Sequence, residues 1–481
     1  MSDKYKKISN KDLTDFEKYH KLKIYDWYNN QFHLSGFSGL VNDPNGLVYF
    51  QGVYYIFMQN CPFSPEHQNK SWSLYTTRDF INYKYHGIVL TPSIKEDAFG
   101  VFSGSAFVWD NKLRFYYTGN IKYLENNTRS SYTIQAEFDF EKQIGIKKVL
   151  FKTDEKKFTG HFRDPVIHYN NNDNKFYMIN GAQNLLEEGV IAIHETNSLE
   201  QPFEFKNIIK LDIFDNYMIE CPNFFSIGDK KVLMVSPERN ISFKDGSHKV
   251  YYQIGDFDKD YKKFKGITNW QELDGGYDFY APQVFNNSDR NLLIGWNGNS
   301  SSEQKITYEN MWSNNLTIVR ELKLKDNKII QTPVEEIKKL RIAPLKSFDN
   351  QVEYQNGLLE MLFENNNQDF EFEILNSNEE KIIFQYQNQV LKIDRSRCTK
   401  TDEESLPNKI ILKQKISSMQ LLVDRSSIEA FINNGENVIS LRFYLMNHEF
   451  VKFKNLNPVF YQLKGYEIDY QNIVWKNQEI K

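Results

Sequence analysis

Short apolar runs separated by a few polar residues recur along the first two thirds of the chain. Each run reaches a turn of Asn, Asp, Gln or Gly and is followed by a second apolar run, which indicates an antiparallel hairpin. Frequent Tyr and Phe at the apolar positions also favour strands over helices. Five such pairs occur: 47–50 with 53–57, 106–109 with 113–117, 166–169 with 176–179, 224–227 with 232–235, and 284–285 with 292–296.

A polar or small residue beside proline or glycine precedes each hairpin at nearly even spacing. The positions are Asp43, Ser103, Asp164, Glu220 and Ala281, and the steps between them are 60, 61, 56 and 61 residues. A period of this size is typical of a repeated supersecondary unit. We therefore predict an all-β fold that begins with a five-bladed β-propeller, in which the entrances of the innermost strands ring one end of a channel. The alternative is a sandwich of unrelated hairpins.

The pattern changes after about residue 345. Apolar and polar positions still alternate at 357–363 and 381–386, and 421–431 predicts a strand–turn–strand, but the acid–proline element is missing. Such alternation is typical of a separate C-terminal β-sandwich. The expected organisation is an N-terminal extension with some helix at 1–31, the propeller at 32–334, a short helical linker at 335–345, and the sandwich at 346–481.

Composition narrows the class of protein. The net charge of −4 gives no reason to expect nucleic acid or an anionic membrane as a partner. No apolar run is long enough to span a membrane, and no signal-type apolar segment follows the N-terminal lysines, so we expect a cytoplasmic protein. Three cysteines without a C-x-x-C pair and nine dispersed histidines predict no disulfide framework, no metal site and no cofactor. A monomer and a homodimer are both compatible with the sequence.

The three repeated carboxylates are the candidates for chemistry, because glycoside hydrolysis requires a pair of carboxyl groups. Asp43 lies in Asn-Asp-Pro-Asn-Gly, which is also a good turn sequence. Arg163 precedes Asp164, and we expect its charge to keep Asp164 ionised. Glu220 lies between Ile219 and Cys221, where an apolar setting favours the protonated form that a general acid needs. Each acid has a purely structural explanation, but their shared register on one repeat favours a common site.

At these residues the chain resembles glycoside hydrolase family 32, the group of invertases, sucrose-6-phosphate hydrolases and fructanases. The resemblance extends from about Phe32 to the C-terminal strands. The motifs that carry it are 42–46 (NDPNG), 102–105 (FSGS), 162–165 (FRDP), 220–222 (ECP), 278–283 (DFYAPQ), 295–296 (GW) and, in the sandwich, 424–427 (DRSS). The stretches 70–72, 77–80, 159–165 and 217–222 are similar to the intracellular sucrose-6-phosphate hydrolases of this family.

The resemblance implies a five-bladed propeller with a sandwich and a retaining mechanism on β-fructofuranosides. It implies that Asp43 is the nucleophile, that Glu220 is the acid and then the base, and that Asp164 stabilises the transition state. It also implies a fructosyl pocket without a metal, lined by Asn42, Gln59, Trp72, Phe102, Ser103, Arg163 and Tyr280. The small-molecule substrate would be sucrose 6-phosphate.

Two alternatives stay open at this point. One is a cytoplasmic invertase or short-fructan hydrolase without phosphate specificity, and the other is a non-catalytic carbohydrate-binding protein of the same fold. The sequence departs from the usual family pattern at Leu40–Val41, at Ile219 and at Glu238. These departures concern the shape of the leaving-group side, since all three acids are present.

Overall fold

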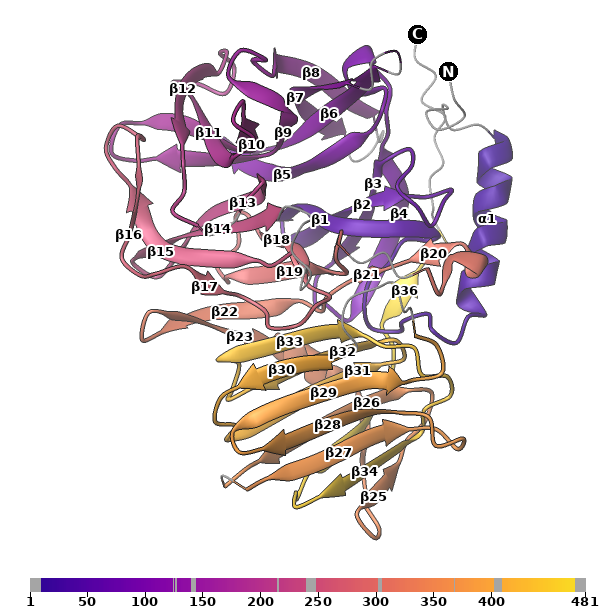
Figure 1. Ribbon diagram of the computed structural model, residues 1–481. Helices are drawn as coiled ribbons and strands as arrows, with labels where there is room; N and C mark the ends of the chain where they lie inside the picture. Colours follow the sequence, from indigo (N-terminus) through magenta and orange to yellow (C-terminus); the bar gives the residue numbers. More distant parts are fainter. Residues whose placement is uncertain are drawn as a thin grey trace.

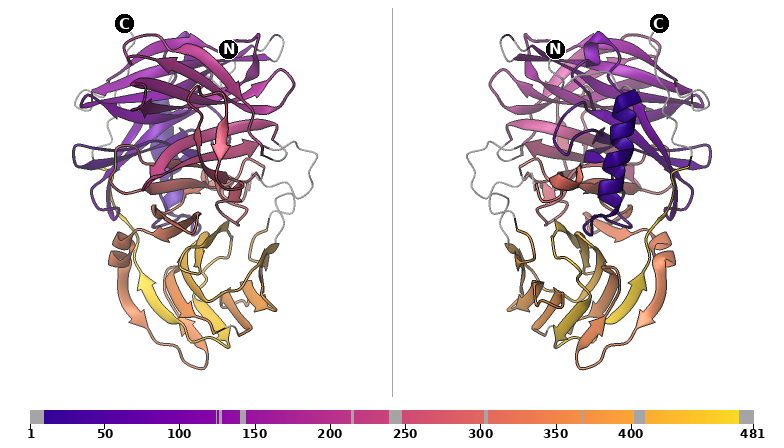
Figure 2. Two further views of the ribbon diagram at one scale, coloured as in Figure 1. Left: turned by 90° about the vertical axis from the view of Figure 1, so that its left-hand side faces the viewer. Right: turned by 90° about the vertical axis from the view of Figure 1, so that its right-hand side faces the viewer.

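The computed structural model describes residues 10–123, 125, 128–139, 144–213, 216–238, 248–301, 305–366, 368–401 and 409–471. A propeller domain, indigo to pink in Figure 1, lies above a smaller domain drawn in orange and yellow. The side views in Figure 2 show the smaller domain as two facing layers of strands. The predicted five-bladed β-propeller followed by a β-sandwich is therefore confirmed.

All five expected hairpins form, and each supplies the two inner strands of one blade. Blade 1 contains β1 (Gly39–Phe50), β2 (Val53–Cys61), β3 (Ser71–Thr77) and β4 (Asn82–Leu90). Blade 2 contains β5 (Val101–Trp109), β6 (Lys112–Tyr123), β7 (Thr128–Asp139) and β8 (Ile144–Lys152). Blade 3 contains β9 (Phe158–Asn170), β10 (Lys175–Asn184), β11 (Gly189–Thr196) and β12 (Glu204–Ile209).

The last two blades are less regular. Blade 4 contains β13 (Met218–Ile227), β14 (Lys230–Glu238), β15 (Tyr251–Phe257), β16 (Phe264–Gly266) and β17 (Gln271–Glu272). Blade 5 contains β18 (Tyr280–Val284), β19 (Leu292–Asn297), β21 (Asn315–Leu316), β22 (Arg320–Lys325) and β23 (Lys328–Pro333). The short strand β20 (Trp312–Ser313) runs parallel to β1. Among the described residues, three short 3-10 helices occur in connections: η2 (Lys95–Asp97), η3 (Tyr308–Asn310) and η4 (Glu335–Leu340).

Aromatic side chains fill the space between neighbouring blades. Between blades 1 and 2, the rings of Phe57 and Phe115 meet edge to face with centroids 4.7 Å apart, and Trp72 packs against both. Edge-to-face pairs are favourable and bury large apolar areas. The aromatic content of the sequence therefore holds the wedge-shaped sheets together.

The innermost strand of every blade carries an irregularity at the same place. In each blade, two residues interrupt the regular pairing of the first strand with the second, as a β-bulge does. The interrupting pairs are Asn42–Asp43, Phe102–Ser103, Asp164–Pro165, Cys221–Pro222 and Ala281–Pro282. The nearly even spacing seen in the sequence is thus the spacing of five equivalent bulges, all at one end of the channel.

Backbone conformation at three of these bulges is unusual. Asp164, Cys221 and Ala281 have φ angles of +60°, +45° and +45°, and each precedes a proline. Left-handed conformations are costly for residues other than glycine and are concentrated at functional sites. In this alignment Glu220 stands one position before the left-handed residue, so it corresponds to Arg163 rather than to Asp164.

The sandwich consists of two six-stranded sheets around one apolar core. The first sheet has the order β24 (Arg341–Leu345), β35 (Val459–Leu463), β26 (Leu358–Glu364), β31 (Ser418–Asp424), β32 (Ser427–Ile432) and β33 (Asn437–Arg442). The second has the order β25 (Gln351–Glu353), β34 (Phe450–Lys454), β27 (Phe370–Leu375), β28 (Lys381–Gln387), β29 (Val390–Arg397) and β30 (Lys409–Lys413). The strand–turn–strand expected at 421–431 is the β31–β32 hairpin.

Three segments near the expected domain limits have contacts that the predicted division did not include. Within the predicted linker, η4 is helical, but β24 pairs with β35 and is the edge strand of a sandwich sheet. In the predicted extension, α1 (Asn10–Ile24) lies along the side of the propeller (Figure 2). The last described strand, β36 (Glu467–Asp469), pairs with β4 of blade 1. The chain therefore returns to the propeller after completing the sandwich.

A buried polar cluster joins the two domains. His33 donates to Asp424 Oδ2 at 2.8 Å and to Glu429 Oε1 at 3.0 Å, with all three side chains fully buried. Glu429 also binds Arg320 of blade 5, which reaches Asp274 at 3.0 Å. Burial disfavours a charged imidazole, but hydrogen bonds to Asp424 and Glu429 outweigh it and raise the pKa of His33 to about 9.

The raised pKa of His33 predicts a pH-dependent stability. Because the pKa of His33 is higher in the folded state, protonated His33 stabilises the folded protein. This stabilisation is complete below the unfolded-state pKa of 6.5 and is lost as the pH rises through about 9. A shift of this size corresponds to about 3 kcal/mol. In urea unfolding, we expect the free energy of unfolding to fall between pH 6.5 and 9 in the wild type and to change less over that interval in His33→Gln. Equal pH slopes for the two proteins would contradict this account.

Candidate active site

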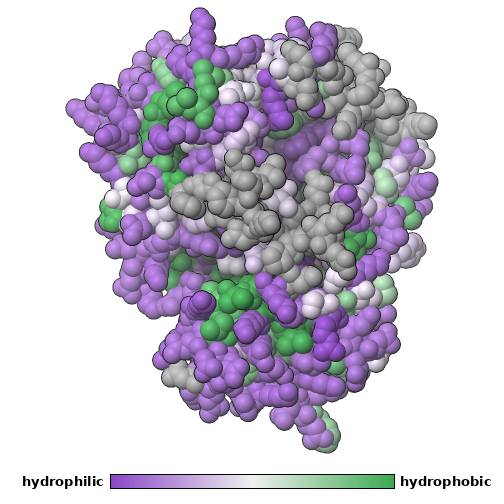
Figure 3. All heavy atoms as spheres, viewed as in Figure 1, coloured by the Kyte–Doolittle hydropathy of each residue, from purple (hydrophilic) through white to green (hydrophobic). Residues whose placement is uncertain are grey.

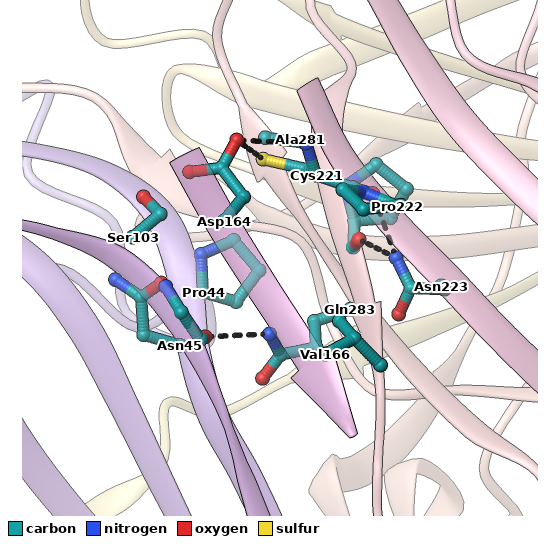
Figure 4. Close-up of a pocket in the computed structure, with 12 residues that line it drawn as sticks. Pro44, Asn45, Ser103, Asp164, Val166, Cys221, Pro222, Asn223, Ala281 and Gln283 are labelled. Carbon is teal, nitrogen blue, oxygen red and sulfur yellow. Dashed lines mark hydrogen bonds between the residues drawn. The ribbon is translucent and has the colours of Figure 1, made fainter. Parts of the chain in front are cut away.

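Residues from all five inner strands meet on the propeller axis. They line a small cavity just beyond the bulges, and Figure 4 shows Asp164, Cys221 and Ser103 at one end of it and Gln283 and Val166 at the other. Polar side chains tie the strands together here: Gln283 donates to the Gly104 carbonyl at 2.9 Å, and Asn223 donates to the Pro282 carbonyl at 2.9 Å. The bulged residues are thus held in fixed positions around the axis.

Asp43 of β1 is held by its neighbours on blades 1 and 2. Asn42 donates to Asp43 Oδ1 at 3.0 Å, and the Ser103 hydroxyl donates to Oδ2. The thiol of Cys221 lies 3.9 Å from the same Oδ2. Burial raises the pKa of Asp43, while the charge of Lys70 and the Ser103 hydrogen bond oppose it. A fixed, partly desolvated carboxylate of this kind is suited to nucleophilic attack.

Asp164 of β9 has a different electrostatic state from the one expected. Burial raises its pKa to about 7, and the charges of Glu220 and Asp43 add to this effect. Arg163 lowers the pKa but does not outweigh burial, because its nitrogens are directed to two glutamates. The prediction that Arg163 keeps Asp164 firmly ionised was therefore wrong. Although Arg163 and Asp164 are adjacent in sequence, the Arg163 guanidinium forms its ion pairs with Glu220 and Glu238.

Glu220 of β13 also differs from expectation. Arg163 Nε donates to Glu220 Oε1 at 2.9 Å, and the Tyr280 hydroxyl donates to Oε2 at 2.7 Å. Burial raises the pKa of Glu220, but Arg163 and Tyr280 outweigh it and lower the pKa below its usual value. The prediction of a protonated Glu220 was wrong for the free protein, because the sequence neighbours Ile219 and Cys221 do not form the surroundings of the carboxylate.

A fourth carboxylate, Glu238 at the end of β14, belongs to the same cluster. Arg163 Nη2 donates to Glu238 Oε2 at 3.1 Å, so one guanidinium binds Glu238 and Glu220 together. Burial and the charge of Glu220 raise the pKa of Glu238. Sequence reasoning noted Glu238 only as a departure from the family pattern. Its pairing with Met218 across the β13–β14 hairpin was the signal that could have placed it near Glu220.

The other predicted site residues lie around these acids. Trp72 and Gln59 are almost fully buried: Trp72 donates to the Phe102 carbonyl at 3.2 Å, and Gln59 donates to the Ser103 hydroxyl at 3.3 Å. They act on the pocket through Phe102 and Ser103, and direct sugar contact by either stays a prediction. Phe102 is partly exposed, with the Lys70 ammonium 4.5 Å from its ring centroid.

No cluster of three or more His, Cys, Asp or Glu side chains suitable for a metal ion is found among the described residues. No helix within those residues is long and apolar enough to cross a lipid bilayer. The groups gathered at the channel entrance are four carboxylates, one shared guanidinium, a tyrosine hydroxyl and a thiol.

Comparison with known protein families identifies the class of protein. Residues 33–333 match the glycosyl hydrolases family 32 N-terminal domain, and residues 323–457 match the family 32 C-terminal domain. The chain belongs to glycoside hydrolase family 32 and is a glycoside hydrolase. The resemblance read from the motifs is thereby confirmed.

Particular relatives share most of their length with this chain. It is 31% identical to the sucrose-6-phosphate hydrolase of Staphylococcus xylosus over 461 residues, which cover 92% of each protein. It is also 31% identical to the sucrose-6-phosphate hydrolase of Bacillus subtilis, covering 90% of this chain and 93% of that protein. The solved structure of sucrose-6-phosphate hydrolase from Lactobacillus gasseri superposes with a TM-score of 0.87 at 28% identity, covering 96% of this chain and 99% of that one.

The shared guanidinium of Arg163 leads to a prediction for Glu238→Gln. The substitution removes a negative charge near Glu220, and Arg163 then forms its ion pair with Glu220 alone. Both changes favour the ionised form, so the pKa of Glu220 should fall further. A fall of about one unit would reduce the protonated fraction of Glu220 about tenfold on the alkaline side of the pH profile, and if Glu220 is the acid of the glycoside hydrolase, kcat/KM would fall by the same factor. Glu200→Gln, which alters an acid paired with Arg114 away from the cavity, should leave the profile unchanged. A Glu238→Gln profile equal to the wild type would contradict the coupling.

Proposed function

We propose that this glycoside hydrolase is a retaining β-fructofuranosidase that cleaves sucrose 6-phosphate into fructose and glucose 6-phosphate. The observation that carries the proposal is the convergence of Asp43 and Glu220 at one channel entrance, each fixed by its own donors. Cys221, which follows Glu220 directly in the chain, brings its sulfur within 3.9 Å of Asp43 Oδ2. The similarity to proteins named sucrose-6-phosphate hydrolases supports this choice of substrate.

In the first step, the Asp43 carboxylate attacks the anomeric carbon of the fructosyl unit while Glu220 protonates the departing oxygen. The Glu220 side chain is 18% exposed in the free enzyme. A sugar placed over it excludes water, and this desolvation raises the pKa of Glu220. The pKa of Asp164 is raised to about 7, and the pKa values of Asp43 and Glu238 are raised as well, so the carboxyl groups around Glu220 keep protons to a higher pH than free carboxyl groups do.

In the second step, the leaving sugar has departed and water reaches Glu220 again. Arg163 and Tyr280 favour the ionised form of Glu220, which is the form that accepts a proton from the attacking water. The water displaces Asp43 and releases fructose. Asp164, adjacent to both acids, hydrogen-bonds the fructosyl hydroxyls, and these bonds strengthen as positive charge develops on the ring.

Replacement of the nucleophile separates a hydrolase from a binding protein of the same fold. We expect Asp43→Asn to lower kcat for sucrose 6-phosphate by about four orders of magnitude while the substrate still binds, because the amide retains the shape but cannot attack. Asp110→Asn, an exposed acid in the β5–β6 turn, serves as the matched control and should retain full activity. Steady-state rates and substrate affinity by calorimetry check both variants. Wild-type and Asp43→Asn proteins that bind sugar and are equally inert would contradict the proposal.

A further inference from the structure

Arg129 lies against Gly160 of β9, close to the charged residues around Glu220. It stands at the beginning of β7, opposite Lys122 of β6, and is exposed. Its side chain crosses the backbone of Gly160 in β9: a Cβ on Gly160 would lie 2.4 Å from Arg129 Cγ and 2.8 Å from the Arg129 carbonyl oxygen. Any side chain at position 160 would therefore block this path, and glycine at 160 leaves room for Arg129 to extend toward β9 and its neighbours.

The guanidinium of Arg129 faces the group of residues around Glu220. Although Arg129 is exposed as a whole, partial desolvation of its guanidinium and the neighbouring charge of Arg163 lower its pKa, while Glu238 and Glu220 oppose the shift. His161, which lies 3.2 Å from Arg163 and packs its ring against Tyr217, belongs to the same edge of the cavity. In the proposed reaction the leaving sugar is attached through the oxygen that Glu220 protonates, which places that sugar next to this group of residues.

The cations near the four carboxylates differ in how far they are already neutralised. Arg163 binds Glu220 and Glu238. Lys70 lies over the ring of Phe102, on the Asp43 side of the cavity. Within the part of the chain that the structure describes, Arg129 makes no ion pair with a carboxylate, and its charge interacts with those of Glu238 and Glu220.

We propose that Arg129, given its path across Gly160, binds the phosphate group on the leaving sugar of the substrate. This inference rests on the proposed function. A phosphate dianion entering a site with four carboxylates requires a cation that is not already neutralised, and a guanidinium matches phosphate oxygens with two parallel hydrogen bonds. Arg129 is then the residue that separates sucrose 6-phosphate from sucrose.

The test compares kcat/KM for sucrose 6-phosphate and for sucrose in the wild type and in Arg129→Gln. We expect Arg129→Gln to lower the value for sucrose 6-phosphate about 100-fold, or about 2.7 kcal/mol, while the value for sucrose changes less than about threefold. Glucose 6-phosphate should also inhibit the variant less strongly than the wild type. Lys84→Gln, which removes the same charge from an exposed position on β4, should change kcat/KM for neither sugar.

A second variant tests the path rather than the charge. Gly160→Ala keeps Arg129 but displaces its stem, and we expect it to lower kcat/KM for sucrose 6-phosphate more than for sucrose. If Arg129→Gln lowers kcat/KM equally for both sugars, or for neither, the assignment of Arg129 is overturned and the hydrolase proposal stands. If the wild type hydrolyses neither sugar, the proposed function fails, and the inference fails with it.

Discussion

The active site depends on one backbone constraint, the bulge at the entrance of each inner propeller strand. A regular strand points successive side chains to opposite faces, so five regular strands would aim few polar groups along the channel axis. The bulges turn two residues per blade out of this alternation, and the left-handed residues Asp164, Cys221 and Ala281 maintain the turn. Blades 1 and 3 both carry a bulge at this place, and the Cys221 sulfur lies 3.9 Å from Asp43 Oδ2 and 3.5 Å from Asp164 Oδ2.

The second organising feature is the charge balance around Arg163. One partly buried guanidinium binds both Glu220 and Glu238, while burial raises the pKa values of Asp43 and Asp164. Because these carboxyl groups interact, a change in the protonation of one of them alters the pKa values of the others. In the proposed mechanism, the bound sugar excludes water and favours protonated Glu220, which acts as the acid. When the leaving sugar departs, Arg163 and Tyr280 favour ionised Glu220, which acts as the base.

Hydrophobic periodicity was sufficient to predict the propeller and the sandwich, because blade hairpins are local and their turns are marked by Asn, Asp and Gly. The position of the three acids was also local, since each lies at the entrance of such a hairpin. Their electrostatics were not local: Glu220 takes its pKa from Arg163 and Tyr280, which lie on blades 3 and 5. The edge strand β24 could not be separated from the linker either, because its partner β35 is more than a hundred residues away.

The most direct test of the account is the anomeric form of the first product. Attack by Asp43, followed by attack of water on the fructosyl–enzyme bond, inverts the anomeric carbon twice and retains its configuration. Proton NMR during the first turnovers of sucrose 6-phosphate should therefore detect β-fructofuranose before mutarotation mixes the forms. Initial release of the α anomer would mean that water attacks the substrate directly, and Asp43 would not be the nucleophile.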